Sequence, residues 1–265
     1  MIKLIASDID GTLVKDSAKE VYPELIEMFQ KLLDQGKIVT VASGRQFYSI
    51  KRMFRELDDQ IVYIAENGAF ISYEGKTLSV IPMEWETVQK IIGDLRKLPQ
   101  DCHILVCCPE GAYMETEDEF FYDLMANSYC NKIDRISDVL EQQRTVIKIS
   151  AFRKDGMREI AESGLIEKWE DIVKVCMAGE QWVDFMDFSV DKGNALKEVQ
   201  KLFGITKEET MAFGDNNNDV GLLMQAGESY AVENAVLETK AVAKYSCPTY
   251  QEKGVYQILY NAFKD

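Results

Sequence analysis

Small polar clusters that could do chemistry follow four apolar, strand-like segments of the sequence. The clusters are Asp8 with Asp10, Ser43 with Gly44, Asn67 with Gly68, and Asp215 with Asn218 and Asp219. In an open α/β sheet, ligands bind beyond the carboxyl ends of the strands. We therefore expect the four clusters to converge on one crevice, and this convergence is more informative than any single cluster.

The charges of these clusters indicate what chemistry the crevice could do. Asp8, Asp10, Asp215 and Asp219 would bring up to four carboxylates into a small volume, where they would repel one another. A cation among them removes the repulsion, and a ligand set made of oxygen atoms alone selects Mg²⁺ or a similar hard ion. Carboxylates, Mg²⁺ and a lysine together are typical of a site that handles phosphate.

The segments around these clusters alternate between strand and helix patterns. Strands are expected at 2–7, 37–42, 61–65, 210–213 and 229–232, and a hairpin at 70–73 and 77–81. Helices are expected at 23–36, from 45 to about 57, and at 191–203, 217–226, 235–244 and 255–263. This alternation predicts right-handed βαβ units and an α/β fold with a doubly wound parallel sheet, built from residues 1–83 and 187–265.

The middle of the chain, residues 84–186, has a different pattern. Helices are expected at 85–98, 119–129 and 156–165, and strands at 103–108, 112–115, 145–152, 172–178 and 181–186, with a linker before residue 145. No obvious catalytic cluster falls in this region. The pattern predicts an inserted α+β domain.

The polar clusters also match the motifs of a known family. Asp8-Ile9-Asp10-Gly11-Thr12-Leu13 resembles the first motif of the haloacid dehalogenase-like superfamily, and Ser43-Gly44-Arg45 its second. Lys192, in Asp191-Lys192-Gly193, resembles the third motif, and residues 214–219 resemble the fourth, in the family's order. The insert at 84–186 is similar to the α+β cap of the Cof-type sugar-phosphatase branch. The resemblance covers essentially the whole chain and implies a Rossmann-like core with a cap that closes over it and selects the substrate.

The resemblance implies a role for each motif residue. Asp8 would be the nucleophile that forms an aspartyl-phosphate, and Asp10 the general acid and base. Mg²⁺ would be bound by the Asp8 carboxylate, the Asp10 backbone carbonyl and the Asp215 carboxylate. The residues implied in phosphate or substrate binding are Thr12, Ser43, Gly44, Lys192 and Asn218. Those in supporting positions are Asp219, Asn67 and Arg45.

Plainer interpretations stay open for several of these residues. An Asp-X-Asp-Gly sequence also occurs in tight turns, and Asn67 with Gly68 could be a turn alone. Arg45 could reach phosphate or form a surface ion pair, and we favour the ion pair. Asp219 could belong only to the first turn of a helix, and Asp191 is expected to be an N-cap.

Composition and charge exclude some classes of function. The 265 residues carry a formal net charge of −15, which makes nucleic-acid binding a poor expectation. The six cysteines form no CxxC pair and the single histidine is His103, so we expect no zinc site and free thiols in a reducing compartment. No apolar run approaches the length of a membrane span, and the first residues are too short for a signal peptide. A cytoplasmic protein, monomer or dimer, is expected.

We therefore expect a Mg²⁺-dependent phosphatase that acts on a small phosphorylated metabolite, with sugar phosphates first. Two alternatives stay open. A phosphomutase would share the chemistry but return the phosphoryl group to its substrate. A non-catalytic protein on the same scaffold would bind a phosphorylated ligand without turning it over.

Overall fold

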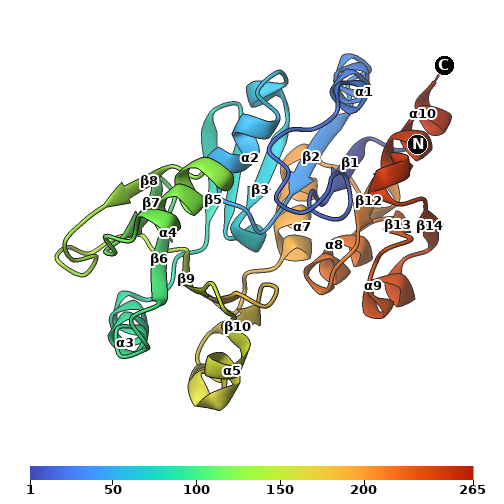
Figure 1. Ribbon diagram of the computed structural model, residues 1–265. Helices are drawn as coiled ribbons and strands as arrows, with labels where there is room; N and C mark the ends of the chain where they lie inside the picture. The colour runs from blue at the N-terminus through green and yellow to red at the C-terminus, as the bar shows by residue number, and fades with distance from the viewer. Residues whose placement is uncertain (265) are drawn as a thin grey trace. The chain divides into compact units, whose positions relative to one another are not determined.

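The computed structural model describes residues 1–264 and forms two compact units. The first unit comprises Met1–Ser79 and the chain from Asp191 onward, and the second comprises Val80–Val190. The chain therefore leaves the first unit once and returns to it once, as the colours of Figure 1 show. In this part of the chain no helix is both long and apolar enough to cross a membrane.

An eight-stranded sheet organises the first unit, in the order β14-β13-β12-β1-β2-β3-β4-β5. The strands are β1 (Leu4–Ser7), β2 (Ile38–Ala42), β3 (Val62–Ala65), β4 (Phe70–Tyr73), β5 (Lys76–Val80), β12 (Thr210–Gly214), β13 (Glu228–Val232) and β14 (Tyr245–Cys247). The strands from β14 to β3 run parallel, and β4 pairs with β3 in the antiparallel direction. The parallel sheet and α/β class predicted from the sequence are thus confirmed.

Helices bury both faces of this parallel sheet. They are α1 (Pro23–Asp34), α2 (Phe47–Met53), α7 (Lys192–Phe203), α8 (Val220–Met224), α9 (Leu237–Val242) and α10 (Gly254–Phe263). Leu4 of β1 packs in one cluster with Leu196 of α7 and Leu222 of α8. Its neighbour Ile5 points to the opposite face and is also fully buried. A strand buried on both faces reads as a continuous apolar run, which explains why β1 was recognisable in the sequence.

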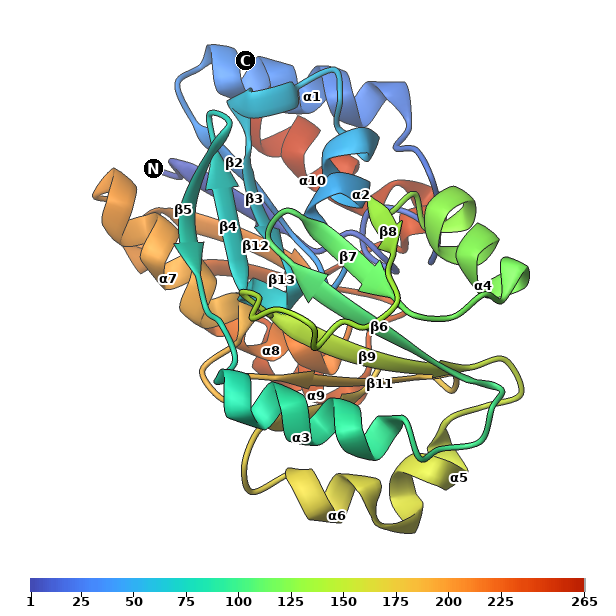
Figure 2. The same ribbon diagram turned by 90° about the vertical axis from the view of Figure 1, so that its left-hand side faces the viewer.

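A six-stranded, mainly antiparallel sheet organises the second unit, in the order β10-β11-β9-β6-β7-β8. The strands are β6 (Cys102–Cys108), β7 (Gly111–Met114), β8 (Ile133–Arg135), β9 (Lys148–Arg153), β10 (Lys174–Met177) and β11 (Trp182–Met186). Its helices are α3 (Trp85–Leu95), α4 (Glu119–Asp123), α5 (Arg158–Ile160) and α6 (Ile166–Trp169). Figure 2 shows α3 along one face of this sheet and α4 on the other.

The two faces of the second sheet are packed differently. On the α3 side, Val88 and Ile92 join a cluster of mainly aliphatic residues from the strands. On the α4 side, Phe121 stacks between His103 and Phe152, at ring-centre distances of 4.7 and 5.3 Å. His103 therefore belongs to an aromatic packing layer of this unit.

Some elements differ from those expected from the sequence. Strand β8 lies inside the segment expected to be a linker, and β14 follows the helix expected to extend to residue 244. Both strands are three residues long and lie at sheet edges, so they carry no apolar run that a sequence pattern could reveal. The helix expected to continue to about residue 57 ends at Met53, and the one expected at 119–129 becomes α4 followed by a π-helical turn at Leu124–Ser128.

Two glycines allow α7 and α8 to approach closely. A Cβ atom added to Gly193, in the first turn of α7, would lie 2.4 Å from the backbone carbon and oxygen of Gly221. A Cβ atom added to Gly221 would lie 2.3 Å from Oδ1 of Asp191. Real atoms cannot approach this closely, so a side chain at position 193 would push the two helices apart, and one at position 221 would displace the Asp191 side chain.

Replacing Gly193 with alanine is therefore expected to destabilise the protein by about 1–3 kcal/mol, the usual cost of overpacking. Gly93 in α3 is a matched control, because a Cβ atom there meets nothing within 4 Å. Gly93→Ala should leave stability unchanged or raise it by up to about 1 kcal/mol through helix propensity. Urea unfolding of the two variants measures both effects, and equal shifts would contradict the close approach.

Candidate active site

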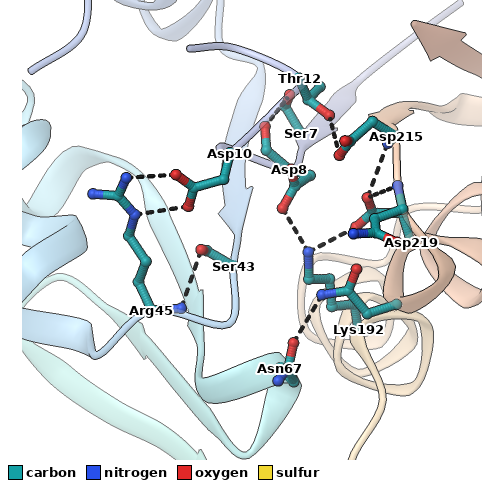
Figure 3. Close-up of polar contacts among 12 residues, drawn as sticks. Ser7, Asp8, Asp10, Thr12, Ser43, Arg45, Asn67, Lys192, Asp215 and Asp219 are labelled. Atoms are coloured by element: carbon teal, nitrogen blue, oxygen red, sulfur yellow. Dashed lines mark hydrogen bonds and ion pairs between the residues drawn. The ribbon is translucent and has the colours of Figure 1, made fainter. Parts of the chain in front are cut away.

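The predicted polar clusters all lie at the carboxyl edge of the first unit's parallel sheet. Asp8 directly follows β1 and Asp215 directly follows β12, and these two strands are neighbours with Ser7 opposite Phe213. Ser43 follows β2, and Asn67 lies in the turn after β3. Parallel strands end at the same edge, so the alternating pattern of the sequence is sufficient to gather these residues (Figure 3).

A buried lysine connects two of the carboxylates. The Lys192 ammonium lies 2.6 Å from Oδ1 of Asp8 and 2.7 Å from Oδ1 of Asp219. Both Lys192 and Asp219 are almost completely shielded from solvent. Asp191 accepts hydrogen bonds from the N–H groups of Gly193 and Asn194, which makes it the N-cap that the sequence predicted and starts α7 at Lys192.

Asp219 has a more central place than the sequence suggested. Its Oδ2 accepts hydrogen bonds from the backbone N–H groups of Asp215 and Asn216, each at 3.0 Å. Its other oxygen faces Lys192. Asp219 therefore shapes the loop that carries Asp215 and at the same time stabilises the lysine, in addition to lying at a helix start.

The electrostatics of the cluster favour a further cation. Burial and repulsion from Asp219 raise the pKa of Asp8 well above its usual value, and the Lys192 charge offsets this only in part. Burial and repulsion from Asp219 also raise the pKa of Asp215 to about 6. A hydrogen bond from Thr12 acts in the opposite direction and offsets part of this rise. Burial acts to lower the pKa of Lys192, but the Asp219 and Asp8 carboxylates outweigh it and raise the pKa.

The donor atoms fit a hard divalent ion. Asp8, Asp215 and Asp219 each offer a carboxylate oxygen, and these atoms lie within 4.8 Å of one another. Because Asp219 already binds Lys192 and two backbone N–H groups, Asp8 and Asp215 are the better candidates for direct ligands. An all-oxygen set of this kind suits Mg²⁺.

Asp10 does not join this carboxylate cluster through its side chain. Its two oxygens bind the guanidinium of Arg45, Oδ2 at 2.7 Å from Nε and Oδ1 at 2.5 Å from Nη2 (Figure 3). The sequence suggested up to four carboxylates in one group, whereas the structure brings three together. Arg45 forms the favoured ion pair, but its side chain is only 10% exposed, so the pair does not lie on the open surface.

The remaining phosphate-binding candidates contact the carboxylate cluster or the supporting residues Asn67 and Arg45. The Thr12 hydroxyl donates to Oδ1 of Asp215 at 3.1 Å, and Asn218 Nδ2 donates to Oδ1 of Asn67 at 2.9 Å. Gly44 lies against the same Asn67 amide, since an added Cβ would be 3.0 Å from its Oδ1. The Ser43 hydroxyl accepts the backbone N–H of Arg45 at 3.1 Å.

Sequence reasoning missed a residue that supports the loop after β1. Asn234 donates from Nδ2 to the carbonyl oxygen of Gly11 at 2.8 Å. It comes two residues after β13, so it too follows a parallel strand. Its position after a predicted parallel strand is a signal in the sequence that places it at the same edge of the sheet as the other clusters.

Several polar side chains of the second unit have partners within that unit. Arg96 pairs with both Glu115 and Asp138, and the Tyr113 hydroxyl donates to Glu110 at 3.1 Å. These contacts connect elements of the second unit to one another.

Comparisons with known proteins agree with this architecture. A protein of Escherichia coli (strain K12), named 5-amino-6-(5-phospho-D-ribitylamino)uracil phosphatase YbjI, is 30% identical over 99% of this chain and 97% of its own. A Bacillus subtilis (strain 168) protein of the same name, YitU, is 24% identical over 98% and 97%. A crystal structure from Eubacterium rectale superposes with a TM-score of 0.89 and 33% identity, covering 98% of this chain and 99% of that one.

The family model described as haloacid dehalogenase-like hydrolase matches residues 5–259. This match spans both units, from β1 to α10. It confirms the family that the four motifs predicted. The chain therefore belongs to the haloacid dehalogenase-like hydrolases.

Proposed function

We propose that this hydrolase is a Mg²⁺-dependent phosphatase that cleaves small phosphate monoesters through an aspartyl-phosphate on Asp8. The observation that carries the proposal is the buried Asp8–Lys192–Asp219 group at the sheet's carboxyl edge, with Asp215 beside it. A phosphoric monoester hydrolase also agrees with the family and with the names of the relatives.

Asp8 is the proposed nucleophile because of its place in this group. Its carboxylate must be ionised to attack phosphorus, and burial opposes ionisation. The Lys192 ammonium at 2.6 Å favours the charged form. The same ammonium is suited to pair with the oxygens of the phosphoryl group, because phosphoryl transfer depends mainly on positioning and charge neutralisation.

Asp10 is the proposed general acid and base. In the first step an Asp8 oxygen bonds to phosphorus, the bond to the leaving oxygen breaks, and that oxygen takes the proton of the Asp10 carboxylic acid. In the second step a water attacks phosphorus and gives its proton to the Asp10 carboxylate. The bond to Asp8 breaks, inorganic phosphate leaves, and both aspartates return to their starting forms.

The metal would be held by the Asp8 carboxylate, the Asp10 backbone carbonyl and the Asp215 carboxylate. When bound, Mg²⁺ supplies positive charge that offsets the charge of the phosphate and of the carboxylates. Asp219 would keep the loop that carries Asp215 in place by accepting the backbone N–H of Asp215. Ser43, Gly44, Thr12 and Asn218, with Asn67 in support, are the proposed contacts of the phosphate.

The relatives' names suggest a substrate class. Both the Escherichia coli and the Bacillus subtilis relatives are named for a phosphate carried on a ribityl chain. We propose a sugar or polyol phosphate of this kind as the small phosphorylated metabolite. The second unit is the proposed cap that selects the leaving group. The six cysteines are free thiols, which supports the cytoplasm as the proposed location.

Phosphate release from a panel of sugar and polyol phosphates tests the reaction. We expect turnover with Mg²⁺, none with EDTA, and recovery when Mg²⁺ is restored. Asp8→Asn should lower kcat by at least about 10³-fold, because it removes the nucleophile. Asp34→Asn, an exposed aspartate on α1, is the matched control and should leave the rate unchanged.

Two results would contradict this function. Accumulation of an isomer without free phosphate would indicate a phosphomutase. Tight binding of one ester with no turnover, in folded and Mg²⁺-loaded protein, would indicate a binding protein.

Stabilisation by Mg²⁺ should depend on pH. An unfolded aspartate loses its proton near pH 3.9, whereas Asp215 in the folded protein holds it to about pH 6. Without metal, ionising Asp215 therefore costs stability as the pH rises through 6, and Mg²⁺ should remove that cost. The Mg²⁺-induced rise in Tm should be largest above pH 6 and shrink below it.

The measurement is thermal unfolding with Mg²⁺ and with EDTA from pH 5 to pH 8. Asp215→Asn should reduce the Mg²⁺ effect across the range and make it less dependent on pH. A wild-type Mg²⁺ effect that grows as the pH falls would contradict the carboxylate site.

A further inference from the structure

Arg45 makes a two-pronged contact with Asp10. Nε and Nη2 of the guanidinium face the two oxygens of the carboxylate, at 2.7 and 2.5 Å. Such a pair fixes the orientation of the carboxylate as well as its place, because both planar groups are held at two points. The carboxylate cannot rotate without losing one of the two bonds.

Arg45 is itself held from several sides. Its Nη1 donates to the carbonyl oxygen of Ala18 at 2.7 Å and lies 3.1 Å from the sulfur of Met53. Its backbone N–H donates to the Ser43 hydroxyl. The arginine side chain is 10% exposed and that of Asp10 is 28% exposed. The guanidinium therefore lies behind the carboxylate, which keeps access to solvent.

The Arg45 contacts also close the loop that follows β1. Asp10 begins this loop, bridges to Val14, and accepts the backbone N–H of Ser17 at 3.0 Å through Oδ1. Ala18 ends it, and Arg45 binds both Asp10 and Ala18. One side chain from the turn after β2 thus holds both ends of the loop.

The two aspartates of the first motif have separate cations. Asp8 binds Lys192, and Asp10 binds Arg45, from different sides of the loop (Figure 3). If Arg45 were a phosphate-binding residue, its charged nitrogens would be expected to point toward the Asp8 cluster. All three of them instead contact Asp10, Ala18 or Met53.

We propose that Arg45 is a positioning residue that orients the Asp10 carboxyl group for proton transfer to and from the substrate. It acts through Asp10 and through the loop between residues 10 and 18, not by contact with the transferred phosphate. This role rests on the proposed function, because it assigns to Arg45 the alignment of that function's acid and base.

The role is tested by comparing two leaving groups. The alcohol of ribitol 5-phosphate is a poor leaving group that needs a proton, whereas p-nitrophenolate leaves readily without one. The comparison uses kcat/KM, which reports on the first step alone, because Asp10 also serves both esters as the base of the second step. Arg45→Met should therefore lower kcat/KM on ribitol 5-phosphate by about 10–100-fold and on p-nitrophenyl phosphate by only a few-fold. Arg45→Lys keeps the positive charge but cannot contact both carboxylate oxygens through a planar group. It should therefore recover only part of the activity that Arg45→Met loses.

A double-mutant cycle separates positioning from other effects. If Arg45 acts through Asp10, Arg45→Met should add little to the loss already caused by Asp10→Asn. Arg55→Met is the matched control, since Arg55 pairs with Glu20 on the exposed surface and should not change either rate. A retained Mg²⁺-induced rise in Tm would show that the Arg45 variants are folded around the metal site.

Two results would overturn the positioning role while leaving the phosphatase intact. One is an equal loss of kcat/KM on both esters that comes from a raised KM, which would mean direct phosphate binding. The other is full additivity with Asp10→Asn. Absence of turnover of both esters by the wild-type protein would instead overturn the proposed function, and this role with it.

Discussion

The site depends on the burial of the Lys192 ammonium between two carboxylates. Removing an ammonium from water costs several kcal/mol, and only close, well-placed partners can offset that cost. Asp8 and Asp219 are such partners, at 2.6 and 2.7 Å. With Asp215 nearby, the group still carries more negative than positive charge, and this surplus is the physical reason to expect a hard cation in the same place.

The backbone around this ion group leaves it little freedom. Neighbouring parallel strands place Asp8 and Asp215 at one edge, and the contact between Gly193 and Gly221 brings the first turn of α7 against α8. Lys192 lies in that first turn, next to Gly193. The cation position is therefore set by helix packing, and the positions of the carboxylates by the sheet.

Two aspartates that are two residues apart acquire different environments in this framework. Asp8 is buried and faces a lysine, whereas Asp10 remains partly exposed and faces the guanidinium group of an arginine. A nucleophile and a proton carrier have different requirements, the first for a neutralising charge and the second for orientation and access. The separate cations would satisfy both requirements, for the proposed roles of Asp8 and Asp10, within one short loop.

The sequence by itself determined the fold class, the family and the residues that gather at the sheet edge, because strand and helix periodicity is local and parallel strands end together. It did not determine which residues would pair. Arg45 binds Asp10, which lies 35 residues away in the sequence, and Lys192 binds Asp8, which lies 184 residues away. Local patterns also gave no sign that Asp219 is fully buried or that Arg45 is turned inward. Such partnerships depend on strand register and helix packing, which only the tertiary structure decided.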